Sequence, residues 1–349
     1  MLRHDLAVAA TIGAGSRVLS LALLAMSYVM WPGSGNPIGG LGGRPFAVWD
    51  GAWYVSIAET GYHATPLSQG LNGPFYDVAF FPAWPVLMTI ASGFGRLPTA
   101  LISGVLANVL FVAACPLIYH ATLRFLDRER ALWTVVLVAF SPAAYVFSIG
   151  YAESLFVLLA AWAFARPSVG PAVLAQVTRL TGFAVGFGLA TDAWIAGHRR
   201  QAGVLVVAPV AAFAAWATAI ALITGRPDGY LLGSPSWYRS TGSSFGPGTL
   251  FGTPAGVAVG LYLSLLAVGC LTIFRRARGM AVYAALVLVA AFALGRWESM
   301  PRLALPAFPA VAGLVVMAWT KWRRLAVLAT FIIGQALLVI LVAAGLEAP

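Results

Sequence analysis

Long apolar runs, separated by short segments that hold most of the arginines, make up nearly all of the chain. A membrane-spanning helix needs about 20 apolar residues, because its backbone polar groups must be satisfied within the hydrocarbon. Hydrophobic residues account for 60% of the 349 residues and charged residues for 9%, which excludes an ordinary soluble domain. The pattern predicts an all-α polytopic membrane protein that forms a single integral membrane domain, residues 1–349.

The apolar runs predict about eleven transmembrane helices. The first run is too long for the core of a signal peptide and has no small-residue cleavage site, so we expect it to be retained as a span. The expected spans are residues 11–31, 99–123, 131–147, a run ending at 165, two short helices on either side of Arg179, and residues 203–224, 252–274, 280–295, 303–319 and 325–345.

The arginine distribution predicts the orientation. Arg3 and Arg17 flank the start of the first span and favour a cytoplasmic N-terminus in the cell membrane. With this orientation, 14 of the 21 lysines and arginines fall inside and the other 7 outside, as the positive-inside rule requires. The basic residues behind the net charge of +10 therefore set the orientation in the membrane, and no nucleic-acid partner is expected.

Two long loops are expected outside the cytoplasm. Residues 32–98 form the first, with short interfacial helices and a half-inserted segment near its end, because Pro82 and Pro85 interrupt a continuous helix. Trp49, Trp53 and Ile57 recur at helical spacing, which suits a helix lying at the membrane surface. Residues 225–250 form the second loop.

The predicted outer face gathers acids and arginines from several loops. Asp50 has two open roles, helix N-cap or catalytic acid or base. Glu153 either stabilises a helix N-terminus through the helix dipole or takes part in the chemistry. Arg179 either extends its charged end to the membrane surface or binds an anion. No phosphate-binding glycine loop and no metal-spaced cluster occurs, so no metal site and no cofactor are expected.

Several motifs, in order along the chain, resemble bacterial relatives of the GPI mannosyltransferase II family, which are GT-C type glycosyltransferases. The motifs are Phe46-x-x-Trp-Asp-Gly-x-Trp-Tyr-x-x-Ile-Ala-x-x-Gly-Tyr62, Ala79-Phe-Phe-Pro-x-x-Pro85, Ser141-Pro, Tyr151-x-Glu-Ser-Leu-Phe156, Thr178-Arg-x-x-Gly182, and Pro301-Arg302 near Phe308-Pro309.

This resemblance implies a GT-C-like fold and transfer of mannose from polyprenyl-phosphate mannose, with inversion, to give an α-mannoside outside the cytoplasm. The expected acceptor is a hydroxyl of a glycolipid, a polysaccharide or a protein, and the sequence leaves these three open. Inversion needs a base for the acceptor proton, and a phosphate leaving group needs positive charge. The expected catalytic residues are Asp50 and Glu153. The expected substrate-binding residues are Trp49, Trp53, Tyr54, Tyr151, Arg179, Arg239, Arg296 and Arg302.

A transporter or flippase of a lipid-linked substrate is the alternative, because a multi-span chain serves it equally well. Transport sites lie near the middle of the membrane between broken helices. Acids at the outer rim therefore favour an enzyme, and acids in the middle of spans favour a carrier.

Overall fold

The computed structural model describes residues 2–32, 36–40, 42–70, 73–233, 254–294, 299–318 and 320–344. These residues are mainly α-helical, with one short antiparallel hairpin in the first long loop. The α-helices are α1 (Leu2–Met30), α2 (Asp50–Thr60), α3 (Ala83–Ala91), α4 (Thr99–Thr122), α5 (Arg128–Ala139), α6 (Glu153–Ala165), α7 (Val169–Gln176), α8 (Phe183–Ile195), α9 (Arg199–Thr224), α12 (Pro254–Ile273), α13 (Arg278–Leu294), α14 (Met300–Ala304), α15 (Phe308–Met317) and α16 (Lys321–Ala343). The remaining elements are the strands β1 (Ser68–Gly70) and β2 (Gly73–Phe75) and the 3-10 helices η1 (Asp77–Ala79), η2 (Ala144–Ser148), η3 (Leu180–Gly182) and η4 (Gly229–Gly233).

Within the described residues, five helices are long and apolar enough to cross a membrane: α1, α4, α9, the part of α12 from residue 256, and α16. Shorter apolar helices, including α6, α8, α13 and α15, lie between them. Each of the eleven predicted runs contains helix, but the number of complete crossings stays a prediction.

Two of the short helices, α6 and α15, lie mostly inside the protein, whereas α8 and α13 each have an exposed apolar side. α6 has 13 residues, a length of about 20 Å at 1.5 Å per residue, and packs closely along α4. Nearly all of its side chains are buried. The irregular segment before it, residues 141–152, is also almost entirely buried, which is the condition for irregular backbone at membrane depth.

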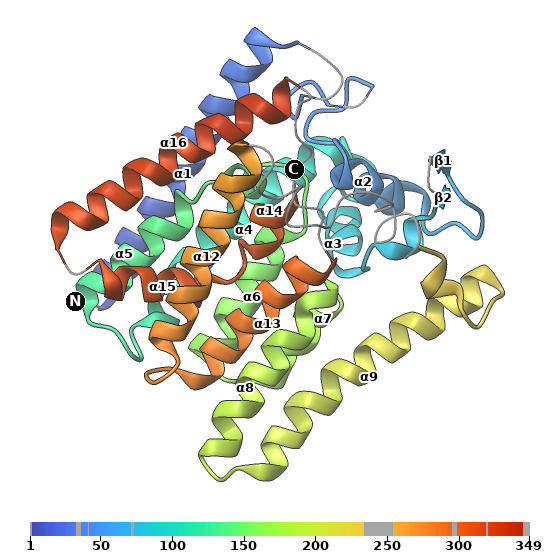
Figure 1. Cartoon of the computed structure of the whole chain (residues 1–349). Helices are drawn as coiled ribbons and strands as arrows, with labels where there is room; N and C mark the ends of the chain where they lie inside the picture. The colour runs from blue at the N-terminus through green and yellow to red at the C-terminus, as the bar shows by residue number, and fades with distance from the viewer. Residues whose placement is uncertain are drawn as a thin grey trace.

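The molecule has two chemically different ends (Figure 1). α2, α3 and the hairpin gather on the right of the view, and we call this the site end. The joints α4–α5, α8–α9, α12–α13 and α15–α16 lie at the opposite side and contain most of the arginine clusters, so we call it the basic end.

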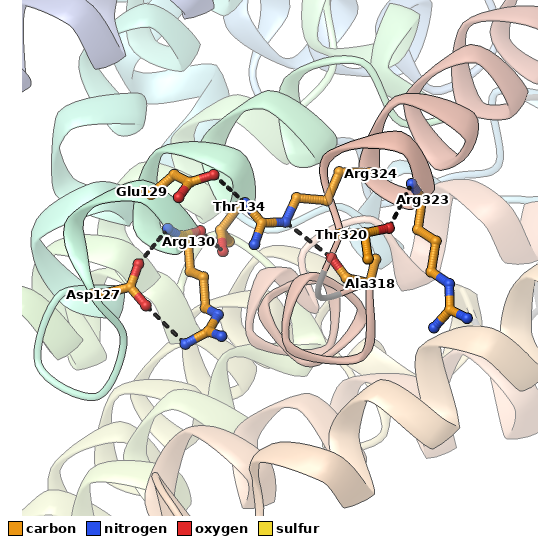
Figure 2. Close-up of polar contacts among 8 residues, drawn as sticks. All are labelled: Asp127, Glu129, Arg130, Thr134, Ala318, Thr320, Arg323 and Arg324. Carbon is orange, nitrogen blue, oxygen red and sulfur yellow. Dashed lines mark hydrogen bonds and ion pairs between the residues drawn. The ribbon is translucent and has the colours of Figure 1, made fainter.

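Polar contacts connect the helix termini at the basic end. Buried Asp5 of α1 accepts from Arg128 Nη2 at 2.6 Å and from Tyr119 Oη at 2.9 Å. Figure 2 shows Arg324, at the start of α16, donating to the Ala318 carbonyl at 2.9 Å and reaching Glu129 of α5 at 2.5 Å. The charged side chains at this end thus hold α1, α4, α5 and α16 together.

Arg17 does not flank the first span, contrary to the sequence-based expectation. α1 begins at Leu2, so Arg17 lies in the middle of the helix and is buried. Its guanidinium donates to the carbonyls of Ala139 at 3.2 Å and Ala144 at 2.7 Å, and to Ser148 Oγ at 2.9 Å. The reason is the early end of α5 at Ala139, which leaves carbonyls inside the protein that need donors.

Replacing Arg17 by leucine should lower the free energy of unfolding by about 1–3 kcal/mol, because buried carbonyls lose their donors. Thermal unfolding of the purified protein in detergent measures the loss. Val18→Leu is the matched control, since the neighbouring Val18 side chain is 70% exposed on the same helix. Equal melting temperatures for Arg17→Leu and the control would show that the carbonyls do not depend on Arg17.

Candidate active site

Asp50 is the first residue of α2, and its carboxylate does not cap the helix. The capping position is taken by Trp49, with φ 44° and ψ −120° and no side-chain cap bond. This backbone conformation is rare for a residue with a side chain and marks a locally strained turn. The capping interpretation of Asp50 is therefore wrong, and its carboxylate is directed to Arg302 instead.

Close backbone packing brings the segments before α2 and before α6 together. A Cβ atom at Gly51 would lie 2.9 Å from the Phe46 carbonyl oxygen, and one at Gly104 of α4 would lie 2.4 Å from the Phe46 ring. The Gly150 amide donates to the Phe46 carbonyl at 3.3 Å, and Trp84 Nε1 donates to the Gly150 carbonyl at 3.0 Å. These contacts explain the glycine that follows Asp50 in the first motif and set Asp50 beside the start of α6.

Four charged side chains from four separate segments form one cluster. Arg302 Nη1 of α14 contacts Asp50 Oδ2 at 2.5 Å, and Arg302 Nε lies 3.7 Å from Glu153 Oε1 of α6. Glu153 also forms an ion pair with Arg179, in the break between α7 and α8. The structure thus brings together Asp50, Glu153, Arg179 and Arg302.

The four members differ in burial. The side chain of Glu153 is 1% exposed, that of Arg302 11%, that of Arg179 14% and that of Asp50 23%. Burial alone would lower the pKa of Arg302, but the Asp50 and Glu153 carboxylates raise it above its usual value. Burial likewise opposes the charge of Arg179, and Glu153 raises its pKa. Both guanidiniums therefore stay charged.

Of the predicted aromatic residues, Tyr151 contacts the cluster, whereas Trp53 and Tyr54 pack on Phe80. The Arg302 guanidinium lies over the ring of buried Tyr151, 5.0 Å from its centroid. Tyr54 and Trp53 of α2 pack against Phe80, with ring centroids 4.9 Å and 5.9 Å apart. Burial raises the pKa of Tyr54 and of Tyr151 well above the usual value, so both phenols stay neutral.

Arg239 and Arg296 fall outside the described residues, as do residues 234–250 of the second predicted loop. Asp77 is fully buried and accepts from the His63 ring at 2.8 Å, which fits a structural role. Among the residues that the structure describes, no three His, Cys, Asp or Glu side chains gather as metal ligands. The expectation of no metal cofactor stays a prediction.

Sequence reasoning missed Gln176, the last residue of α7. Its side chain is fully buried, and neither its amide nitrogen nor its amide oxygen has a hydrogen-bond partner. The available signal was its position, three residues before Arg179 in an otherwise apolar run.

Comparison with known proteins gives a family match to part of the chain and a similar fold. Residues 40–198 match the mannosyltransferase (PIG-V) family. Comparison with curated protein sequences gave no match.

Among solved structures, the fold is similar to the oligosaccharyltransferase of Archaeoglobus fulgidus tethered to an acceptor peptide. The TM-score is 0.53 at 12% identity, with 100% of this chain and 56% of that chain covered. The apo form of the same protein gives a TM-score of 0.49 at 12% identity, covering 99% and 56% of the two chains. The chain therefore spans little more than half the length of that protein. The chain is thus a multi-pass membrane protein whose residues 40–198 match the mannosyltransferase (PIG-V) family and whose fold is similar to that of an archaeal oligosaccharyltransferase.

Proposed function

We propose that the protein transfers mannose from polyprenyl-phosphate mannose to an acceptor hydroxyl of a glycolipid, a polysaccharide or a protein. The observation that carries this proposal is the Asp50–Arg302 contact at 2.5 Å, which joins a partly exposed carboxylate to the buried Glu153–Arg179 pair. A candidate base and two guanidiniums that can bind a phosphate thus lie side by side. The matched mannosyltransferase family supports glycosyl transfer as the reaction.

The reaction needs one bond to form and one to break. The acceptor oxygen forms a bond to the anomeric carbon of mannose, while the bond from that carbon to the phosphate oxygen breaks. The phosphate oxygen leaves with the electron pair, and the acceptor proton passes to Asp50. The anomeric configuration inverts, because attack and departure occur on opposite faces of the sugar.

Exposure favours Asp50 over Glu153 as the base. The Asp50 side chain is 23% exposed and reachable by an acceptor, whereas Glu153 is 1% exposed and lies against Arg179 and Arg302. In this proposal Glu153 neutralises and orients the two guanidiniums. A carboxylate that opposes two buried positive charges stabilises them in the absence of substrate.

Arg302 and Arg179 are suited to the donor phosphate. A guanidinium offers several N–H donors in a planar fork that matches phosphate oxygens. Arg302 Nε is buried and has no hydrogen-bond partner, so it retains a donor for a phosphate oxygen. The stack on Tyr151 fixes the plane of the guanidinium.

The transporter alternative has no comparable support. The described acids within the spanning or shorter apolar helices include Asp5 and Asp192, and both contact groups at the basic end. Asp5 pairs with Arg128, and Asp192 accepts from the Gly279 amide at 2.8 Å. Neither acid sits at a midpoint between broken helices, where a carrier would bind its substrate.

Asp50→Asn should lower transfer from polyprenyl-phosphate mannose by about 10²–10⁴-fold, the contribution of a general base. The assay follows labelled mannose from the lipid donor into acceptor in membranes of known protein content. Glu59→Gln is the control, because Glu59 lies on the same helix and pairs with partly exposed Arg44. Parallel incubations with polyprenyl-phosphate glucose and with a nucleotide-linked mannose test the donor class. Full transfer by Asp50→Asn, or consumption of the nucleotide sugar alone, would contradict the proposal.

Glu153→Gln should destabilise the protein by about 3–5 kcal/mol, because the buried Arg179 loses its counter-charge. Glu59→Gln should change stability by less than about 1 kcal/mol, since the Arg44–Glu59 pair is solvent-accessible. Thermal unfolding in detergent compares the two variants. Equal stability of the two would argue against Glu153 as the neutralising group.

The site end should face away from the cytoplasm. Cysteines introduced by Ser68→Cys at the site end and His198→Cys at the basic end occupy exposed positions. The native Cys115 and Cys270 are buried and should not react. A membrane-impermeant thiol reagent applied to intact cells should label the first variant and not the second. The reverse labelling pattern would place the site in the cytoplasm and overturn the proposed sidedness.

A further inference from the structure

We propose that Gln176 binds a sugar hydroxyl of the donor and thereby forms the sugar-recognition part of the site. This inference rests on the proposed function and assigns a contact that the motifs did not indicate. Its starting point is the fully buried amide of Gln176, in which neither Nε2 nor Oε1 has a hydrogen-bond partner. Leaving a buried polar group without a partner costs about 1–3 kcal/mol, so such a group needs a specific explanation.

The position of Gln176 places it with the charged cluster. Ala172, Ala175 and Gln176 are the last buried positions of α7. The Arg179 amide donates to the Ala175 carbonyl at 3.2 Å, so the chain turns closely at the end of α7, and the Arg179 backbone itself is extended (φ −154°, ψ 153°). Gln176 therefore lies three residues before Arg179, at the same end of α7. Arg179 reaches Glu153 of α6, against which α7 packs.

Neighbouring backbone closes the other side of Gln176. A Cβ atom at Gly182 would lie 2.2 Å from the Gln176 Cα atom, so η3 lies directly on this residue. The Ala83 amide at the start of α3 donates to the Val177 carbonyl at 2.9 Å. The end of α7 is thus enclosed by protein, and its free amide is held away from lipid.

The chemistry of the amide suits a hydroxyl better than a phosphate. A carboxamide is neutral and both donates and accepts, as sugar hydroxyls do, whereas phosphate is matched by Arg179 and Arg302. Gln176 precedes Arg179 by three residues, so their Cα atoms lie at most about 10 Å apart, which is within the span of a sugar phosphate. A sugar attached to a phosphate at Arg179 is therefore within reach of Gln176. The buried Tyr151 hydroxyl, also without a partner, offers a second neutral group.

A site that hydrogen-bonds a hydroxyl discriminates strongly against a ligand that does not satisfy it, because buried polar groups are then left unpaired. Gln176→Leu removes both the carbonyl oxygen and the NH₂ group of the side-chain amide and keeps a similar side-chain size. The kcat/KM for polyprenyl-phosphate mannose should fall roughly 10- to 100-fold. Inhibition by polyprenyl phosphate, which lacks the sugar, should keep its inhibition constant within about twofold.

The matched control is Gln335→Leu. Gln335 is also fully buried in an apolar helix, but it donates to Ser20 Oγ at 2.7 Å between α16 and α1, away from the charged cluster. This variant should lower thermal stability and leave kcat/KM per folded protein within about twofold of the wild type. The comparison separates loss of a buried amide from loss of a sugar contact.

The experiment uses the purified full-length chain and has distinct outcomes. A reduced kcat/KM with unchanged inhibition by polyprenyl phosphate supports the inference. An unchanged kcat/KM in Gln176→Leu overturns it, and so does a parallel weakening of inhibition, which would indicate damage to the whole site. If the wild-type protein uses no polyprenyl-phosphate sugar at all, the proposed function fails instead, and the two failures are thus distinguishable.

Discussion

Two carboxylates and two guanidiniums can lie together inside a membrane protein only when they neutralise one another, and the site end is arranged around this condition. Asp50, Glu153, Arg179 and Arg302 come from the first long loop, α6, the α7–α8 break and α14. Each supplies a charge that the others need, so the four segments are fixed relative to one another. Removing one member leaves a buried charge without compensation, which is more costly than losing a surface ion pair.

The same requirement extends to the backbone around the cluster. The chain between α5 and α6 is irregular, and its carbonyls need donors within the protein. Arg17 supplies two of them and also bonds Ser148 Oγ, which in turn donates to Asn108 Oδ1 at 2.9 Å. Trp84 Nε1 satisfies the Gly150 carbonyl next to Tyr151. A buried arginine far from the charged cluster thus supports the segment that leads to Glu153.

Apolar runs predict the long helices well, because a helix that can span a membrane is recognised by its length and hydropathy. Residues 99–123 were expected as a span and α4 covers Thr99–Thr122. The expectation is poorer where helices are short and protein-covered: residues 303–319 divide into α14 and α15, and residues 131–147 into α5 and η2. Arg17 was misassigned because composition cannot distinguish a flanking arginine from one that satisfies buried carbonyls.

For the site, loop position and motif pointed to the four charged residues that the structure places together. Ionisable groups at membrane edges are costly and tend to be functional. Their pairing was not predictable, because partners such as Asp50 and Arg302 lie far apart in the chain and meet only through helix packing. The role of Asp50 as an N-cap was wrong for the same reason: the strained turn at Trp49 is a tertiary feature. Gln176 carried no motif, and its free amide is evident only from burial.

A cryo-electron microscopy map of the protein with polyprenyl-phosphate mannose bound tests the central claim most directly. The account predicts phosphate density within hydrogen-bond distance of the Arg179 and Arg302 guanidiniums, with the anomeric carbon of the sugar facing Asp50. Phosphate density at the basic end, or a donor whose sugar lies away from Asp50, would contradict it.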